Sequence, residues 1–218
     1  LAVAVNGRLE YCVAEHASHG RLVVARALVD TLAEKLGGPL EVLATFTGDE
    51  LAQGTKYVRP LPDEEANGLA AEAPVVVGGE YITADGGTGL VHTAPGHGAD
   101  DYATGLKAGV AGGPFSPVDD AGRYTAAAGE RFKGLQVTTD GNDAVVSALS
   151  AENGTGALLL LEPYEHKYPY DWRTKKPVIT RATSQWFASV ESFRADAAAA
   201  IDGVSWVPAL GKNSISTM

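Results

Sequence analysis

Two β-favouring runs lie within residues 1–13, with a turn dipeptide between them. The runs 1–5 and 8–13 flank Asn6-Gly7, a dipeptide that readily supplies the positive φ angles of a two-residue hairpin loop. From residue 21 to residue 36, apolar side chains recur at helical spacing, and Gly37-Gly38-Pro39 then provides a stop. The pattern therefore predicts a hairpin at 1–13 and an amphipathic helix at 21–36.

Short apolar runs then alternate with segments rich in Gly, Pro and Asp. We predict strands at 40–46, 75–77, 81–83 and 89–91, and a buried strand at 157–161. Helices are expected at 100–107, 142–151 and 190–201. This succession of short strands favours a β-rich α+β fold or a β-barrel.

Composition narrows the class of protein. The chain has 218 residues, of which 45% are hydrophobic, and this share is typical of a soluble globular protein. Its longest aliphatic run, Ala157 to Leu161, is far shorter than the roughly 20 residues of a membrane span. Cys12 is the only cysteine, so no internal disulfide is possible and a reducing compartment is expected. Because the sequence opens at Leu1 and not at Met, we expect it to be a piece of a longer protein.

Charge is unevenly distributed along the chain. The net charge of -10 argues against a protein that grips nucleic acid along its length. Residues 163–185, however, are basic and aromatic, with five Lys and Arg against two acidic residues. This stretch predicts either a nucleotide-stacking and phosphate-binding site or a surface strand pair with aromatic core residues. We expect a change of character here, with a core at 1–163 and an extension at 164–218.

The segment 86–102 is the densest in candidate chemistry. It joins a glycine-rich entry, a short strand, a loop with His92 and His97, and a helix opened by Asp100 and Asp101. A carboxylate here would pair with a substrate ammonium group, and His92 would position water or exclude a bulky group. The alternatives are turn glycines, a structural histidine and ordinary helix-opening aspartates. A divalent metal held by these four side chains is a weaker alternative, because the spacing fits no zinc signature.

One segment closely resembles the editing (CP1) domain inserted in the isoleucyl-tRNA synthetase family of class I aminoacyl-tRNA synthetases. This segment is Gly87-Thr-Gly-Leu-Val-His-Thr-Ala-Pro-Gly-His-Gly-Ala-Asp-Asp-Tyr102. The resemblance extends through 116–123, 166–177 and 181–187, and so covers nearly the whole chain. The resemblance implies that valyl and leucyl enzymes share the general domain. The loop within 87–102 and the Arg-Ala-Thr-x-Gln-Trp-Phe motif are, however, similar to the isoleucyl branch.

The resemblance implies a closed β-barrel editing domain with peripheral helices. Its activity would be hydrolysis of the ester that joins a wrong amino acid, chiefly valine, to the isoleucine tRNA, with valyl-adenylate as a further substrate. Because one methylene separates valine from isoleucine, a single pocket discriminates poorly and a second site removes the errors.

The resemblance also implies roles for single residues. Asp101 would anchor the substrate α-ammonium, and His92 would line the pocket, exclude isoleucine and lie near the hydrolytic water. Pocket walls would come from Gly87, Thr88, Thr93, Gly96 and His97. The tRNA acceptor end would meet Arg173, Lys175, Lys176 and Arg181. Neither a cofactor nor a metal is expected in this domain, since ATP and magnesium serve the catalytic core of the parent enzyme.

Departures from the family pattern leave an alternative open. The threonine-rich strand that supplies groups to the same pocket would lie just before Leu1, so a non-catalytic fragment that only binds the tRNA acceptor end is the second hypothesis. Residues 164–218 would lead back toward the catalytic core, and the rest of the synthetase chain is the expected partner, with no membrane. The wording of 170–176 is similar to organellar or cyanobacterial forms, which favours a cytoplasmic, plastid or mitochondrial location.

Overall fold

The computed structural model describes residues 1–61, 71–110, 115–152 and 154–217. The chain divides into two compact units, Leu1–Ala182 and Thr183–Met218. The larger unit carries every named strand and α1 to α4, and the smaller one carries α5 (Arg194–Asp202) and α6 (Gly211–Ser216). The expected division after residue 163 stays a prediction.

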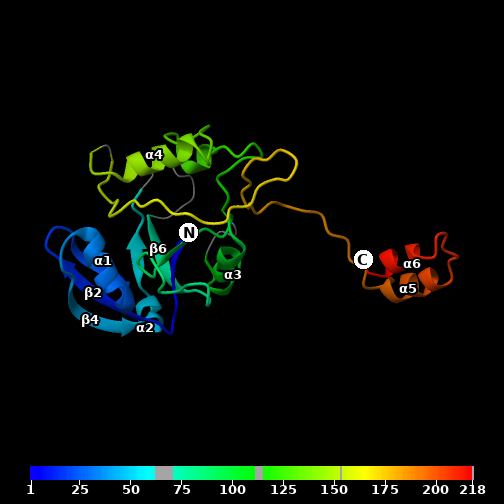
Figure 1. Ribbon diagram of the computed structural model, residues 1–218, viewed down its shortest axis with the longest axis horizontal. Coiled ribbons are helices and arrows are strands. Elements are labelled where there is room, and N and C mark those ends of the chain that lie inside the picture. Colours follow the sequence, from blue (N-terminus) through cyan, green and yellow to red (C-terminus); the bar gives the residue numbers. More distant parts are fainter. Residues whose placement is uncertain (62–70, 111–114, 153, 218) are drawn as a thin grey trace. The chain divides into compact units, whose positions relative to one another are not determined.

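Two β-sheets form the base of the larger unit (Figure 1). The first has the order β5 (Lys56–Val58), β6 (Glu72–Val77), β1 (Ala2–Val5), β7 (Val91–Thr93), and the second has the order β3 (Gly20–Ala25), β2 (Glu10–His16), β4 (Glu41–Thr47). Strand β1 runs parallel to β6 and antiparallel to β7, and the second sheet is wholly antiparallel. The α+β class is therefore confirmed.

The predicted closed barrel is not seen among the described strands, which form two separate sheets. The sheets meet at one corner, where the Ala25 N–H donates to Thr88 O at 2.8 Å and the buried Tyr11 hydroxyl donates to Gly89 O at 2.8 Å. Gly87 and Gly89 have φ angles of 66° and 76°, so this segment turns and cannot extend the contact into a ladder. For the same reason the strand predicted at 89–91 begins only at Val91.

The hairpin predicted at 1–13 is wrong, because β1 and β2 belong to different sheets. The turn exists, since the Leu9 N–H donates to Asn6 O at 3.1 Å. Its Asn6 side chain, however, donates to Ile82 O at 2.9 Å and its backbone N–H donates to the Tyr11 hydroxyl at 3.0 Å. These contacts hold the two strands apart, and β2 pairs with β3 and β4.

The helix predicted at 21–36 is correct only in its second half. Residues up to Ala25 form β3, a 3-10 turn follows at Arg26–Leu28, and α1 covers Val29–Leu36. The β-branched Val23 and Val24 pair with β2, and this tertiary pairing overrides the helical spacing of the apolar residues. The stop is confirmed, because Gly37 caps α1 with a left-handed φ of 73°.

Most other elements match the sequence pattern. The predictions of β4, β6, α3 (Ala99–Lys107) and α4 (Asp140–Leu149) are confirmed within a few residues, whereas α5 starts four residues late and α2 (Gly48–Ala52) and β5 were not predicted. Strands at 81–83 and 157–161 do not form. Ile82 is fully buried within a turn, whereas Leu161 is 63% exposed. Neither segment pairs with a neighbouring strand.

The main hydrophobic core lies between the second sheet and α1. Its largest fully buried members are Tyr11, Val5, Val24 and Cys12. A smaller cluster joins Ala2, Ala4, Val76 and Ile82 on the first sheet. This core fixes β1 and β7, and thereby the base of the candidate site. Among the described residues, no helix is long and apolar enough to cross a membrane.

Candidate functional site

The loop between β7 and α3 is held by the side chain of Asp101. The Ala94 N–H donates to Asp101 Oδ2 at 3.0 Å, and the His97 N–H donates to Ala94 O at 2.8 Å. Asp100 and Asp101 also lie in the first turn of α3, where negative charge is favourable. Asp101 thus ties the start of α3 to the end of β7, and the histidine-bearing loop is fixed between them.

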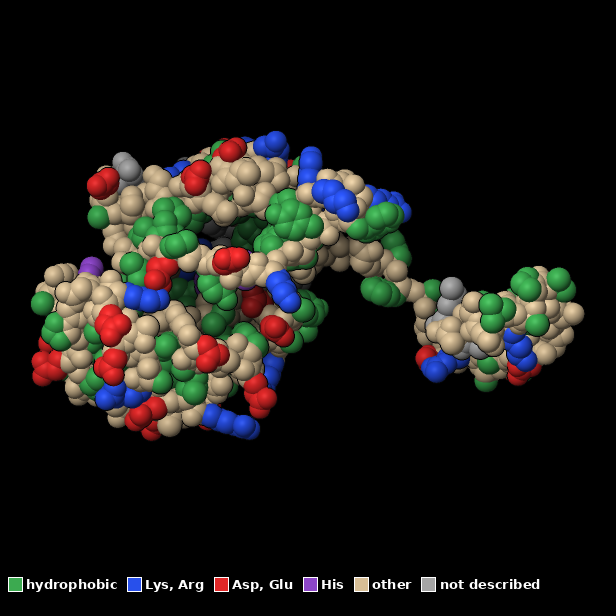
Figure 2. Space-filling model, in the orientation of Figure 1, with side chains coloured by type: hydrophobic (Ala, Val, Ile, Leu, Met, Phe, Trp, Pro, Cys, Tyr) green, Lys and Arg blue, Asp and Glu red, His purple; other side chains and the backbone are tan. Residues whose placement is uncertain are grey.

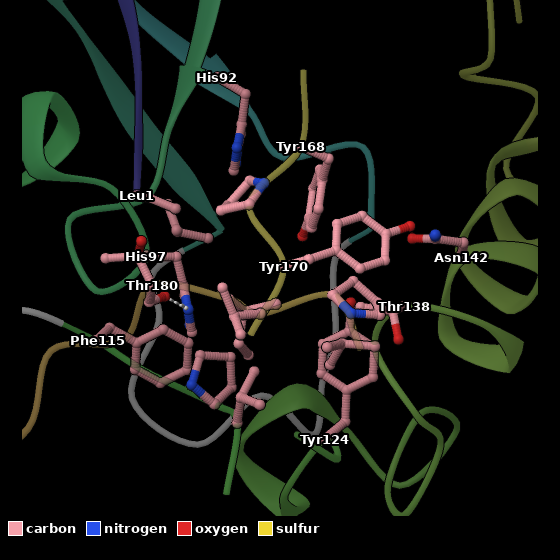
Figure 3. A pocket seen from close by; sticks show the side chains of 18 residues that line it. Leu1, His92, His97, Phe115, Tyr124, Thr138, Asn142, Tyr168, Tyr170 and Thr180 are labelled. Carbon is pink, nitrogen blue, oxygen red and sulfur yellow. Dashed lines mark hydrogen bonds between the residues drawn. The ribbon is translucent and has the colours of Figure 1, made fainter. Parts of the chain in front are cut away.

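Strand β7 separates its side chains onto two faces. Thr93 is fully buried and its hydroxyl donates to Val91 O at 3.3 Å. Because side chains alternate along a strand, His92 faces the opposite way. It points into a hollow beside Leu1, as the close-up in Figure 3 shows.

The hollow has a volume of about 850 Å³, and Figure 2 shows the surface hollowed near the N-terminus. Figure 3 labels ten of the residues that line it: Leu1, His92, His97, Phe115, Tyr124, Thr138, Asn142, Tyr168, Tyr170 and Thr180. A second, more apolar hollow of about 400 Å³ adjoins it and shares His92 and Phe115 with it. Mostly apolar walls with a few polar groups are typical of a site for a small ligand.

Residues 180–182 cross the histidine-bearing loop as a strap. The Ala182 N–H donates to Gly96 O at 2.8 Å, and Thr180 O lies 3.1 Å from His97 Nδ1. A carbonyl oxygen only accepts, so Nδ1 of His97 carries the proton. Its buried Nε2 atom has no hydrogen-bond partner among the described residues. The strap thereby sets the tautomer of His97.

Arg181 anchors the same strap. Its guanidinium donates to Val118 O at 2.9 Å and forms an ion pair with Asp120. Three-quarters of the Arg181 side chain is buried, whereas that of Asp120 is 94% exposed. The bond to the buried Val118 carbonyl is therefore the firmer of the two attachments. A phosphate contact by Arg181 would have to compete with both.

The other predicted tRNA contacts lie on a hairpin loop. Tyr170 and Pro177 form an antiparallel bridge, and the Asp171 N–H donates to Lys176 O at 2.9 Å. Hydrogen bonds from Thr174 lower the pKa of the Asp171 carboxyl, so it remains ionised inside the loop. Between these ends, the side chains of Arg173, Lys175 and Lys176 are exposed.

The structure brings only part of the predicted site together. His92 and His97 line the hollow, and Gly96 lies behind His97, against Phe115. Gly87 is exposed in a turn, and the fully buried Thr93 points into the core. Thr88 faces β3 through its carbonyl oxygen. Asp101 holds the loop from behind, within electrostatic reach of His92.

The local environment keeps His92 neutral. Burial by the surrounding walls lowers the pKa of His92, and the Asp101 carboxylate partly opposes this lowering. The ring is open to the hollow, but protein surrounds the hollow on several sides, which accounts for desolvation at an accessible side chain. At neutral pH His92 is therefore an uncharged imidazole, and one of its ring nitrogens can accept a hydrogen bond.

This lowered pKa predicts a pH dependence of stability. Because the folded-state pKa lies below the unfolded value, the unfolded state binds the proton more readily. The free energy of unfolding should fall as the pH drops below about 6.5, and His92→Gln should lessen that fall. Urea unfolding at pH 7.5 and pH 5 measures the difference. His19→Gln, on an exposed turn, is the control, and an equal change in both variants would contradict the assignment to His92.

The described structure gives little support to the metal alternative. In the part of the chain that it describes, no group of three or more His, Cys, Asp or Glu is arranged to hold a metal ion. Cys12 is fully buried within β2, and burial raises the pKa of its thiol. Cys12 is thus a packed small hydrophobe.

Comparison with known proteins gives whole-chain matches. The chain is 53% identical over 218 residues to an isoleucine–tRNA ligase of Synechococcus sp. (strain CC9311), and 52% identical to those of Microcystis aeruginosa and Nostoc punctiforme. Each match covers 100% of this chain. By sequence, the whole chain is similar to one part of the isoleucine–tRNA ligases. It spans about a fifth of the length of these curated relatives, 21% in the first two cases.

Two further comparisons add little to the isoleucyl-tRNA synthetase relationship. No family model matches the chain. A solved structure titled "The crystal structure of GlLeuRS-CP1" is 22% identical over 50% of this chain and 43% of its own, with a TM-score of 0.39. At that score the likeness does not establish a shared fold. The relationship therefore rests on sequence identity.

Several residues of the hollow were not predicted from the sequence. Phe115, Tyr124 and Thr138 come from segments for which no element was predicted, and Asn142 was predicted only as the start of a helix. Tyr168 belongs to the basic aromatic segment, for which the sequence left a binding site and a surface strand pair as equal alternatives. The segment 86–102 supplies one wall of the hollow, and these residues supply the others (Figure 3).

Proposed function

We propose that the chain is the editing domain of an isoleucyl-tRNA synthetase and hydrolyses valyl-tRNA for isoleucine. The observation that carries the proposal is the placement of the neutral His92 imidazole in the wall of a mostly apolar hollow. The segment that bears it also carries the family resemblance. The 53% identity to an isoleucine–tRNA ligase supports the parent enzyme.

In this proposal the Asp101 carboxylate and the neutral His92 imidazole have different roles. The Asp101 carboxylate attracts the α-ammonium that every aminoacyl ester carries. His92 accepts a hydrogen bond from the attacking water and narrows the space for the amino-acid side chain. Because an aminoacyl ester is already reactive, orientation supplies much of the rate. Gly87, Thr88, Thr93, Gly96 and His97 then act chiefly by shaping the loop.

The partners follow from the same proposal. The tRNA acceptor end would meet the exposed Arg173, Lys175 and Lys176, with Arg181 holding the strap beneath them. The rest of the synthetase would bind the tRNA body and use ATP and magnesium, while this domain would need no cofactor. Its setting would be the cytoplasm or an organelle.

Deacylation tests the proposal directly. Valyl and isoleucyl forms of the isoleucine tRNA are incubated with the 218-residue chain, and in parallel with the full-length enzyme that carries it. We expect the full-length enzyme to clear valine and spare isoleucine, with or without a chelator. Binding of both forms without hydrolysis would favour the non-catalytic alternative, and loss of activity with the chelator would favour a metal hydrolase.

A further inference from the structure

Four aromatic rings follow one another along the segment that leads to the hollow. We call Tyr164, His166, Tyr168 and Tyr170 the aromatic ladder. Successive ring centroids are 5.3, 5.7 and 6.2 Å apart. The rings occupy every second position, and side chains at that spacing lie on one face of an extended chain. The sequence alternation thus produces a continuous aromatic face.

The aromatic ladder is exposed. The residues Tyr164, Tyr168 and Tyr170 are 84%, 41% and 61% exposed. Large apolar rings left in contact with water as one patch indicate a binding surface. Trp172, in the hairpin loop that follows, is 71% exposed, and the Arg173 guanidinium lies 4.7 Å from its ring. The aromatic surface is therefore longer than the aromatic ladder alone.

Positive charge accompanies these rings. Residues 164–176 carry the cations Lys167, Arg173, Lys175 and Lys176, and none of these four forms an ion pair within the described residues. Figure 2 shows Lys and Arg side chains beside hydrophobic ones over the loop that Figure 1 draws in yellow to orange. In a chain of net charge -10, such a patch favours a polyanion as its occupant.

The aromatic ladder is also continuous with the hollow. Tyr168 and Tyr170 belong both to the ladder and to the wall that faces His92 (Figure 3). We propose that the aromatic ladder stacks the unpaired bases of a nucleic-acid strand whose end enters the hollow. Every base has a π-face, so such a surface binds single strands with little sequence preference. The inference rests on the proposed function for the identity of the strand, and adds the residues that hold it.

Anisotropy with a labelled, unpaired RNA of eight nucleotides tests the proposal on the 218-residue chain. Tyr164 and His166 lie outside the hollow, so Tyr164→Leu and His166→Leu remove stacking there without altering its walls. We expect each Leu variant to weaken RNA binding by about 5-fold or more. Tyr164→Phe keeps the ring and should bind like the unaltered chain. An abasic strand of equal length carries the same charge and should bind equally to all variants.

Three outcomes decide the matter. Weaker RNA binding by the Leu variants, with unchanged abasic binding, supports stacking. Equal RNA binding by all variants overturns it and makes the aromatic ladder a face covered by the rest of a longer protein. Parallel loss of RNA and abasic binding would overturn it in favour of phosphate contact alone. Because the RNA is not aminoacylated, a failure of hydrolysis leaves this test intact.

Discussion

Replacing Asp101 with asparagine should slow hydrolysis of valyl-tRNA for isoleucine by about 100-fold or more in the full-length enzyme. The amide oxygen of asparagine can still accept from the Ala94 N–H, as Asp101 Oδ2 does at 3.0 Å. The loop therefore keeps its tie while the negative charge is lost. The expected defect lies in the ammonium–carboxylate pair, which a neutral amide cannot replace. Single-turnover deacylation measures it.

The neighbouring aspartate is the matched control. Asp100 lies in the same first turn of α3 and is exposed, so Asp100→Asn removes an equal charge from the same helix end. We expect Asp100→Asn to stay within a few-fold of the unaltered enzyme. A rate unchanged by Asp101→Asn would remove Asp101 from substrate binding. Equal losses in both variants would instead indicate a general effect of charge at the helix start.

Local signals predicted those parts of the fold that short-range physics decides. The helices α3 and α4 follow from their local residue patterns, with an acidic first turn as a further signal for α3, and β4 and β6 follow from apolar runs between turn residues. The hairpin failed because strand pairing is not local. Asn6 forms a side-chain bond to Ile82, 76 residues away, and nothing in the sequence around Asn6-Gly7 reports that contact.

The candidate site shows the same division. His92 and His97 stand in one recognisable segment, so the sequence could nominate both. Tyr124 and Asn142 reach the hollow only through the fold, and single-sequence patterns carry no trace of that meeting. Asp101 was singled out for its charge, yet its side chain also accepts a hydrogen bond from the Ala94 N–H, a structural role that only the fold reveals. In the proposed function, the carboxylate oxygen of Asp101 that is not bound to Ala94 would meet the substrate ammonium.

Gly96→Ala should destabilise the chain and deform the hollow. A Cβ atom at Gly96 would lie 2.1 Å from Phe115 O and 2.7 Å from Phe115 C. Both are backbone atoms, so the contact can be relieved only by moving the loop or the chain at Phe115. Overpacking of this kind costs about 1–3 kcal/mol, which lowers the melting temperature by roughly 2–4 °C for each kcal/mol in a chain of this size. Calorimetry measures the change.

The matched control is Gly86→Ala. A Cβ atom at Gly86 meets nothing within 4 Å, and the φ angle there is not in the left-handed region. This variant should melt like the unaltered chain, although Gly86 lies in the same segment, 86–102, as Gly96. Since Gly96 O also accepts from the Ala182 N–H, movement at Gly96 would release the strap that fixes His97. Gly96→Ala should therefore lose deacylation as well as stability, and unchanged melting together with full activity would show that the close approach to Phe115 is not required.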